Sequence, residues 1–200
     1  MRVRGERQGR GLFHAILAII LIVVGAPAVA GADSLWARQT RGVWFMGIGG
    51  ALGLSNFDDY DGGDPTGGPT FRVGIRPVRA FAVEAQADYF VKFEDGNARP
   101  ILATANGRWM IPRGWLIPRS IDEEGRWQPF LLGGAGWMQG RQTEDGEFDK
   151  LDSAVFRVGL GVEYYPTLDF AWRIDAQYMI PAGDASDLQF AALLITLQLY

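Results

Sequence analysis

The sequence contains no cysteine and only one histidine, and these two absences remove most familiar enzyme chemistry. Without cysteine there is no disulfide framework, no thiolate metal site and no thiol nucleophile. His14 lies in a segment that we expect to be removed, so the mature chain has no imidazole for acid–base work or metal binding. Lys and Arg total 19 against 23 Asp and Glu in 200 residues, and this balance predicts no nucleic-acid partner.

The first 30 residues have the three parts of a secretory signal peptide. Four Arg and one Glu lie in residues 1–10, an apolar run follows over residues 12–24, and Ala28 and Ala30 form an A-x-A cleavage site. The run is shorter than the roughly 20 residues that a membrane-spanning helix needs, which disfavours a retained anchor. We predict cleavage after Ala30, which leaves 15 basic and 22 acidic residues, a net charge of −7, in an exported protein.

No later stretch is a long apolar run, and apolar and polar residues alternate with period 2 instead. Between Phe81 and Phe93 the odd positions are apolar, while the even positions include Glu84, Gln86 and Asp88. Only an extended strand places such sets on opposite faces. The same pattern, in stronger or weaker form, predicts eight strands: 42–55, 70–78, 81–93, 99–112, 127–140, 156–165, 170–180 and 188–200.

The lengths of these strands, about 9 to 14 residues, match tilted strands that cross a membrane rather than the strands of soluble sheets. Connections 79–80 and 166–169 are short, as periplasmic turns are, whereas the alternate connections 56–69, 94–98, 141–153 and 181–187 are polar and acidic. Residues 113–126 are an exception, which we interpret as a long periplasmic excursion. After a lead-in over residues 31–41, the predicted fold is an all-β, eight-stranded antiparallel up-and-down barrel over residues 42–200.

Two features favour a membrane barrel, with its apolar face outward, over a soluble barrel with an apolar core. Aromatic residues on the apolar faces gather near strand ends, as in the two girdles of outer-membrane barrels. The polar faces carry many glycines beside charges of both signs, and a narrow eight-stranded barrel needs small residues between long ones. A secreted soluble barrel that binds a lipophile stays open as an alternative.

The chain resembles the small eight-stranded outer-membrane β-barrel family, of the OmpA transmembrane-domain and OmpW kind. The resemblance covers about residues 40–200 and rests on the repeated alternation, the Gly-rich segments 129–136 and 156–163, and the aromatic C-terminal residue Tyr200. It implies a bacterial outer-membrane location reached through the periplasm, contact with membrane lipid and lipopolysaccharide, and assembly by the barrel assembly machinery. It also implies that Tyr200 is an assembly signal, although alternation places Tyr200 on the polar face with Gln198 and Thr196.

Candidate chemistry outside the barrel wall is sparse, and we expect neither an enzyme nor a cofactor. Enzymes that share this fold rely on a catalytic histidine, which the mature chain lacks. One acidic stretch resembles a calcium loop, but Thr70 stands where a bidentate Glu is needed, so a solvated hairpin is favoured. Its candidate metal ligands are Asp58, Asp59, Asp61 and Asp64.

The acidic connections together carry 13 acidic and two basic residues, and we expect them to attract divalent cations loosely. On the polar faces of the strands, opposite charges are close to balance, which predicts a lumen closed by ion pairs. The predicted residues are Arg72, Arg76, Glu84, Asp88, Lys92, Arg108, Arg157, Glu163, Arg173 and Asp175. Two functions remain open: a structural or surface-interaction barrel with a filled lumen, or a small channel for ions or apolar solutes.

Overall fold

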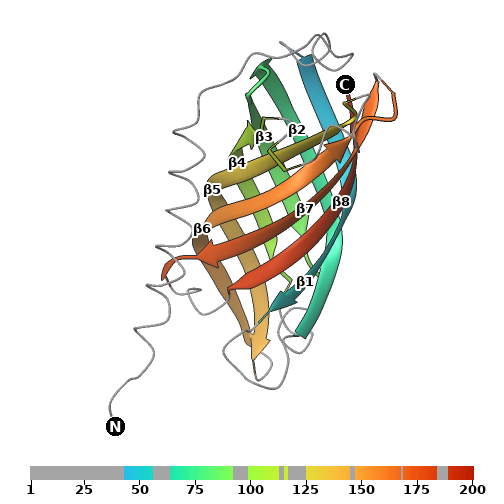
Figure 1. The fold of residues 1–200 in the computed structure, drawn as a ribbon. Coiled ribbons are helices and arrows are strands. Elements are labelled where there is room, and N and C mark those ends of the chain that lie inside the picture. The colour runs from blue at the N-terminus through green and yellow to red at the C-terminus, as the bar shows by residue number, and fades with distance from the viewer. Residues whose placement is uncertain are drawn as a thin grey trace. The chain divides into compact units, whose positions relative to one another are not determined.

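The computed structural model describes residues 43–55, 64–91, 99–112, 115–116, 125–144, 147–167, 169–183 and 189–200; for 55, 64–65 and 141–151 it describes the backbone alone. Eight strands form one closed barrel, in which each strand is antiparallel to its neighbours in the sequence and β1 pairs with β8 (Figure 1). The strands are β1 (Val43–Ser55), β2 (Asp64–Val78), β3 (Phe81–Tyr89), β4 (Ile101–Met110), β5 (Trp127–Glu144), β6 (Glu147–Tyr164), β7 (Phe170–Pro181) and β8 (Phe190–Leu199). The predicted eight-stranded antiparallel barrel is confirmed.

The two ends of the barrel are defined by the strands that are connected there. The β2–β3, β4–β5 and β6–β7 connections lie at the end where β1 begins and β8 ends, which we call the turn end. The other four connections join strand ends at the opposite end of the barrel, the loop end, toward which the β1 arrow points in Figure 1. The predicted signal segment, the lead-in and Lys92 lie outside the described residues.

Alternation in the sequence becomes alternation of burial in the barrel wall. In β7 the odd positions from Ala171 to Met179 are buried, whereas Trp172, Ile174 and Ala176 are exposed. The buried set is polar or charged in the middle of the strand, and the exposed set is apolar. A soluble barrel has the reverse arrangement, so the alternative of a secreted soluble barrel that binds a lipophile is wrong for this chain.

Large apolar side chains cover the outside of the barrel, and aromatic rings stand near both ends of the strands. Trp44, Trp109 and Trp172 lie near the turn end, while Trp137 and Phe156 lie toward the loop end, and all five are exposed. Rings at two levels of an apolar surface are typical of the two membrane interfaces. No helix in the described part of the chain is long and apolar enough to cross a bilayer.

Three strands are longer by several residues than the sequence predicts. β2 begins at Asp64, so residues 64–69 pair with β1 instead of belonging to a loop. β5 and β6 run on to a tight hairpin in which Glu144 pairs with Glu147, so the predicted loop over residues 141–153 is wrong. These extensions lack the alternation of apolar and polar residues that marks the other strand segments. An antiparallel strand outside the membrane can face water and needs no apolar face.

Candidate functional site in the barrel interior

The barrel interior is filled by ionic side chains over its middle and its turn-end half. Alternate positions of β2, β3, β4, β6 and β7 point inward, and each strand contributes one or two charged residues there. All of these side chains are buried, with at most 1% of their surface exposed. We call them the charged layer: Arg72, Arg76, Glu84, Asp88, Arg108, Arg157, Glu163, Arg173 and Asp175.

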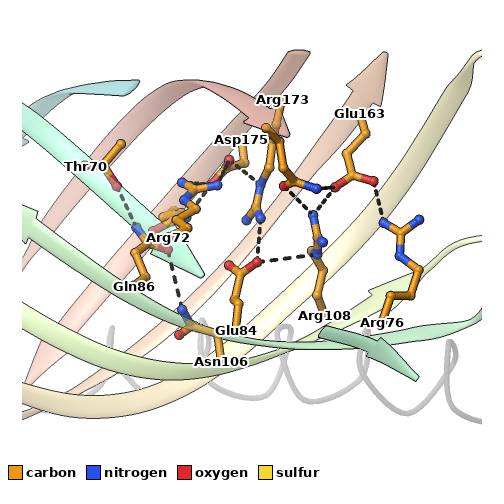
Figure 2. Close-up of polar contacts among 12 residues, drawn as sticks. Thr70, Arg72, Arg76, Glu84, Gln86, Asn106, Arg108, Glu163, Arg173 and Asp175 are labelled. Atoms are coloured by element: carbon orange, nitrogen blue, oxygen red, sulfur yellow. Dashed lines mark hydrogen bonds and ion pairs between the residues drawn. The ribbon is translucent and has the colours of Figure 1, made fainter. Parts of the chain in front are cut away.

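Ion pairs connect these residues across the lumen, starting from Asp175 (Figure 2). Arg72 donates to both oxygens of Asp175, at 2.9 Å to Oδ1 and 3.2 Å to Oδ2. Arg173 binds two carboxylates, with Nε 2.9 Å from Asp175 Oδ1 and Nη1 2.7 Å from Glu84 Oε2. The planar fork of a guanidinium group suits this kind of double contact.

The series continues toward the turn end. Arg108 lies between Glu84, with 3.6 Å from Nε to Oε2, and Glu163, to which Nη1 donates. Arg76 Nη2 donates to the other oxygen of Glu163 at 2.7 Å. Positive and negative groups therefore alternate without a break along the interior, in the order Arg72, Asp175, Arg173, Glu84, Arg108, Glu163, Arg76.

A separate pair, Arg157 and Asp88, lies closer to the loop end. Arg157 Nη2 donates to Asp88 Oδ2 at 2.5 Å, and its Nη1 donates to Gln177 Oε1 at 2.8 Å. Gln177 also donates to Asp175, which joins this pair to the main series. Gln86 Nε2 supplies a second donor to Asp88, at 2.8 Å from Oδ1.

Two tyrosines lie next to the charged layer at the turn end and form hydrogen bonds with it. The Tyr165 hydroxyl lies 2.5 Å from Glu163 Oε2 and 2.7 Å from the Tyr200 hydroxyl, and it accepts from Arg76 Nη1 at 3.0 Å. Gln198 donates to Tyr200 and, at 3.3 Å, to Glu163 Oε1. The Tyr200 side chain therefore points into the barrel, on the face that the alternation indicates.

Aromatic rings support the guanidinium groups, and glycines make room for the rings. The Cζ atoms of Arg108 and Arg173 lie 5.3 Å and 4.5 Å from the centre of the Phe130 ring. A Cβ atom at Gly161 would lie 2.7 Å from Phe130 Cζ, closer than side-chain atoms tolerate. At Gly74 a Cβ would lie 2.4 Å from Phe45 Cζ, and that ring also faces Arg108. The glycines of the polar faces thus have a steric role.

Toward the loop end the interior becomes apolar. A cluster of buried side chains, which we call the apolar layer, crosses the lumen there. Phe90 and Phe190 meet edge to face, with 5.2 Å between ring centres. The whole set is Ala51, Phe90, Leu102, Met138, Val155, Met179, Phe190, Ala192 and Leu194. Water and ions would have to cross this layer to reach the charged layer from the loop end.

The charged layer has five arginines and four carboxylates, a net charge of +1 over the described residues. Several of its polar atoms have no partner in the structure, including Arg108 Nη2, Arg173 Nη2 and Glu84 Oε1. Buried polar atoms of this kind are often satisfied by internal water.

Nine of the ten residues predicted for the lumen lie in the charged layer, and the tenth, Lys92, is outside the described residues. Sequence reasoning missed Gln177, Gln198 and Tyr165, which bridge between the ion pairs. Gln177 and Gln198 occupy the polar faces of their strands, so the alternation indicates that both point into the lumen. Tyr165 directly follows β6, but the predicted strand 156–165 places it on the same face as Glu163, so the alternation indicates its direction as well.

Among the described residues, no group of three or more His, Asp or Glu could hold a metal ion. Of the candidate metal ligands, Asp58, Asp59 and Asp61 lie outside the described residues, while Asp64 pairs with Ser55 in the barrel wall. The carboxylates of the charged layer are each bound to arginine.

Small outer-membrane barrels of known structure share this fold at low sequence identity. Neisserial surface protein A is 10% identical, with a TM-score of 0.63 over 78% of this chain and 96% of its own. The attachment invasion locus protein Ail of Yersinia pestis is 14% identical, with a TM-score of 0.54 over 80% and 98%. OprG of Pseudomonas aeruginosa is 13% identical, with a TM-score of 0.52 over 81% and 99%.

A search of curated proteins finds no match to the sequence. A family model does match, over residues 16–199, nearly the whole chain. The chain therefore belongs to the outer membrane protein beta-barrel domain family and is a protein of the bacterial outer membrane.

Proposed function

We propose that this protein is a non-conducting outer-membrane barrel with a structural or surface-interaction role, whose lumen is closed and whose loop end presents the interacting surface. The single observation that carries the proposal is the filled interior: an unbroken series of four arginines and three carboxylates, with an apolar layer next to it on the loop-end side. Eight strands enclose only enough volume for side chains, unlike the wide lumen of a porin.

The direction of the barrel in the membrane supports an outward role for the loop end. Barrels of this kind place short turns in the periplasm and longer segments outside the cell. Here the long β5–β6 hairpin is at the loop end. Its 15 residues from Gly140 to Ala154 hold five acidic and two basic residues, a net charge of −3.

The sign of that charge separates this protein from one of its structural neighbours. Ail has been solved in complex with sucrose octasulfate, a heparin analogue. A polyanion would be repelled by the acidic hairpin of this chain. We therefore expect a cationic partner rather than a sulfated one.

A test is conductance of the purified, folded protein in planar lipid bilayers, with folding checked by heat-modifiable gel mobility. We expect no steady conductance above that of the lipid alone. A porin reconstituted in parallel controls for insertion. A reproducible steady current carried by wild-type protein would refute the closed lumen.

The second candidate function is a narrow channel, and one observation favours it. The described interior carries five arginines against four carboxylates and keeps several unpartnered polar atoms, as a wet, anion-selective path would. In that case the current would be anion-selective, and Arg173→Ala would change ion flux more than stability. In the closed barrel, the same substitution lowers stability and leaves flux at zero.

A further inference from the structure

The β5–β6 hairpin extends well past the strands on either side of it. Pairing between β4 and β5 ends at Gln139, and pairing between β6 and β7 begins at Val155. Beyond these points, residues 140–144 of β5 pair with residues 147–151 of β6, and the other edge of β6 meets no strand as far as Ser153 among the described residues; we call residues 140–144 and 147–153 the outer ribbon. In the part of the chain that the structure describes, no third strand pairs with it, so each of its limbs is a sheet edge.

The direction of the backbone groups along β6 follows from the last hydrogen bond to β7. Ala182 N donates to Ala154 O at 2.8 Å, so the backbone groups of Ala154 point away from β5. In an antiparallel pair this direction repeats at every second residue. The N–H and C=O groups of Phe148, Lys150 and Asp152 therefore face outward along the edge, where they are available to a further strand.

The β6 limb is the longer and the more acidic of the two edges. Residues 147–153 span about 24 Å at roughly 3.4 Å per residue, and they carry three acidic groups against Lys150. Residues 140–144 of β5 are fewer and have one charge of each sign. The β6 edge thus offers room for an extended segment of about seven residues and a field that attracts positive charge.

The same charges argue against a second copy of this chain as the occupant. Natural edge strands avoid pairing with themselves by means of charge. Two β6 edges side by side would bring acidic residues together, and like charges directly opposite one another are destabilising. A strand with basic residues removes that repulsion and gains cross-strand ion pairs.

We propose that the β6 edge of the outer ribbon binds an extended, basic polypeptide segment by strand addition. Backbone hydrogen bonds to Phe148, Lys150 and Asp152 hold the segment, and the acidic residues of the ribbon select its charge. This proposal rests on the proposed surface-interaction role of the loop end, but it does not require the lumen to be closed.

Labelled eight-residue peptides of alternating Thr and Lys, and of alternating Thr and Glu, test the proposal with the full protein in lipid nanodiscs. We expect the basic peptide to bind, and the acidic peptide to bind at least tenfold more weakly, by fluorescence anisotropy at low salt. A further basic peptide of the same sequence carries an N-methyl group on every residue, which keeps its charge and removes the donors from both of its edges. We expect its affinity to fall at least tenfold below that of the unmethylated basic peptide.

Equal affinity of the N-methylated and the unmethylated basic peptide would mean attraction by charge alone and would overturn strand addition. Equal affinity of the acidic and basic peptides would overturn the assigned partner. Asp152→Pro removes an outward donor from the edge, whereas Asp152→Asn removes only the charge, so we expect the proline variant to lose more affinity. Concentration-dependent dimers that Asp152→Pro abolishes would instead assign the edge to a second copy. Conductance measured on the same nanodisc preparation after transfer to bilayers reports separately on the closed lumen.

Discussion

The two halves of the barrel interior are closed by opposite kinds of chemistry. In the charged layer, carboxylates and guanidinium groups contact one another directly, and several of these groups have two ionic partners. In the apolar layer, buried apolar side chains such as Leu102, Leu194 and Met138 pack against one another. Both layers are buried, but the first depends on matched charges and the second on matched shapes.

This difference predicts how each layer fails. Removal of one member of a buried ion pair leaves its partner charged and desolvated, at a cost that exceeds the value of the pair itself. Removal of apolar volume leaves a cavity, whose cost depends on how far the neighbours relax. The substitutions below compare the layers by free energies of unfolding, measured by urea titration in lipid vesicles.

Glu163→Gln is the substitution with the largest expected effect. Glu163 pairs with both Arg76 and Arg108, so its loss leaves Arg76 without a carboxylate and Arg108 with only the 3.6 Å contact to Glu84. We expect a loss of about 3 to 5 kcal/mol in the free energy of unfolding. Asp152→Asn, which removes an exposed carboxylate, is the matched control and should stay within about 0.5 kcal/mol of wild type. Equal effects of the two substitutions would contradict a buried, ion-paired charged layer.

Leu194→Ala tests the apolar layer. Leu194 is fully buried, whereas its neighbour Leu193 is 47% exposed on the outer face. We expect Leu194→Ala to lower the free energy of unfolding by about 3 kcal/mol. Leu193→Ala should cost clearly less, because lipid chains replace the lost contacts. The reverse order would show that the faces of β8 are misassigned.

A third comparison uses two adjacent glycines of β5. A Cβ at Gly134 would lie 2.0 Å from Asn106 Oδ1 and 2.5 Å from the Ala105 carbonyl oxygen, whereas a Cβ at Gly133 meets nothing within 4 Å. Gly134→Ala therefore overpacks the interior, and we expect a loss of about 2 kcal/mol. Gly133→Ala should leave stability unchanged or slightly increased. If both variants unfold alike, the interior is looser than its packing indicates.

Tyr200→Phe has the smallest expected effect. It removes a hydroxyl that contacts Tyr165 and Gln198 but keeps the ring beside Phe45, so we expect a loss of about 1 kcal/mol. The assembly role that family resemblance implies for Tyr200 depends on the aromatic ring, so folded yield in cells should be normal for Tyr200→Phe and reduced for Tyr200→Ala. Normal yield for both variants would remove Tyr200 from assembly.

Most of the barrel wall could be predicted from the sequence, and the exceptions have a physical cause. Strict alternation around Phe81 and Phe170 marks strands because membrane and lumen impose opposite chemistry on their two faces. That contrast ends beyond the barrel wall, so the sequence predicts a loop over residues 141–153, where the structure has the paired outer ribbon. Its two limbs pair because a tight hairpin holds them together.

Within the site, the sequence determined which residues face inward, since the direction of a side chain follows from its parity along a strand. It did not determine which charges meet. Arg72 and Asp175 are 103 residues apart, and only closure of the barrel, with its register and tilt, brings β2 opposite β7. Composition and period thus established a membrane barrel with a polar interior, whereas the order of the ion pairs and the free edges of the ribbon were decided by how the strands close around the lumen.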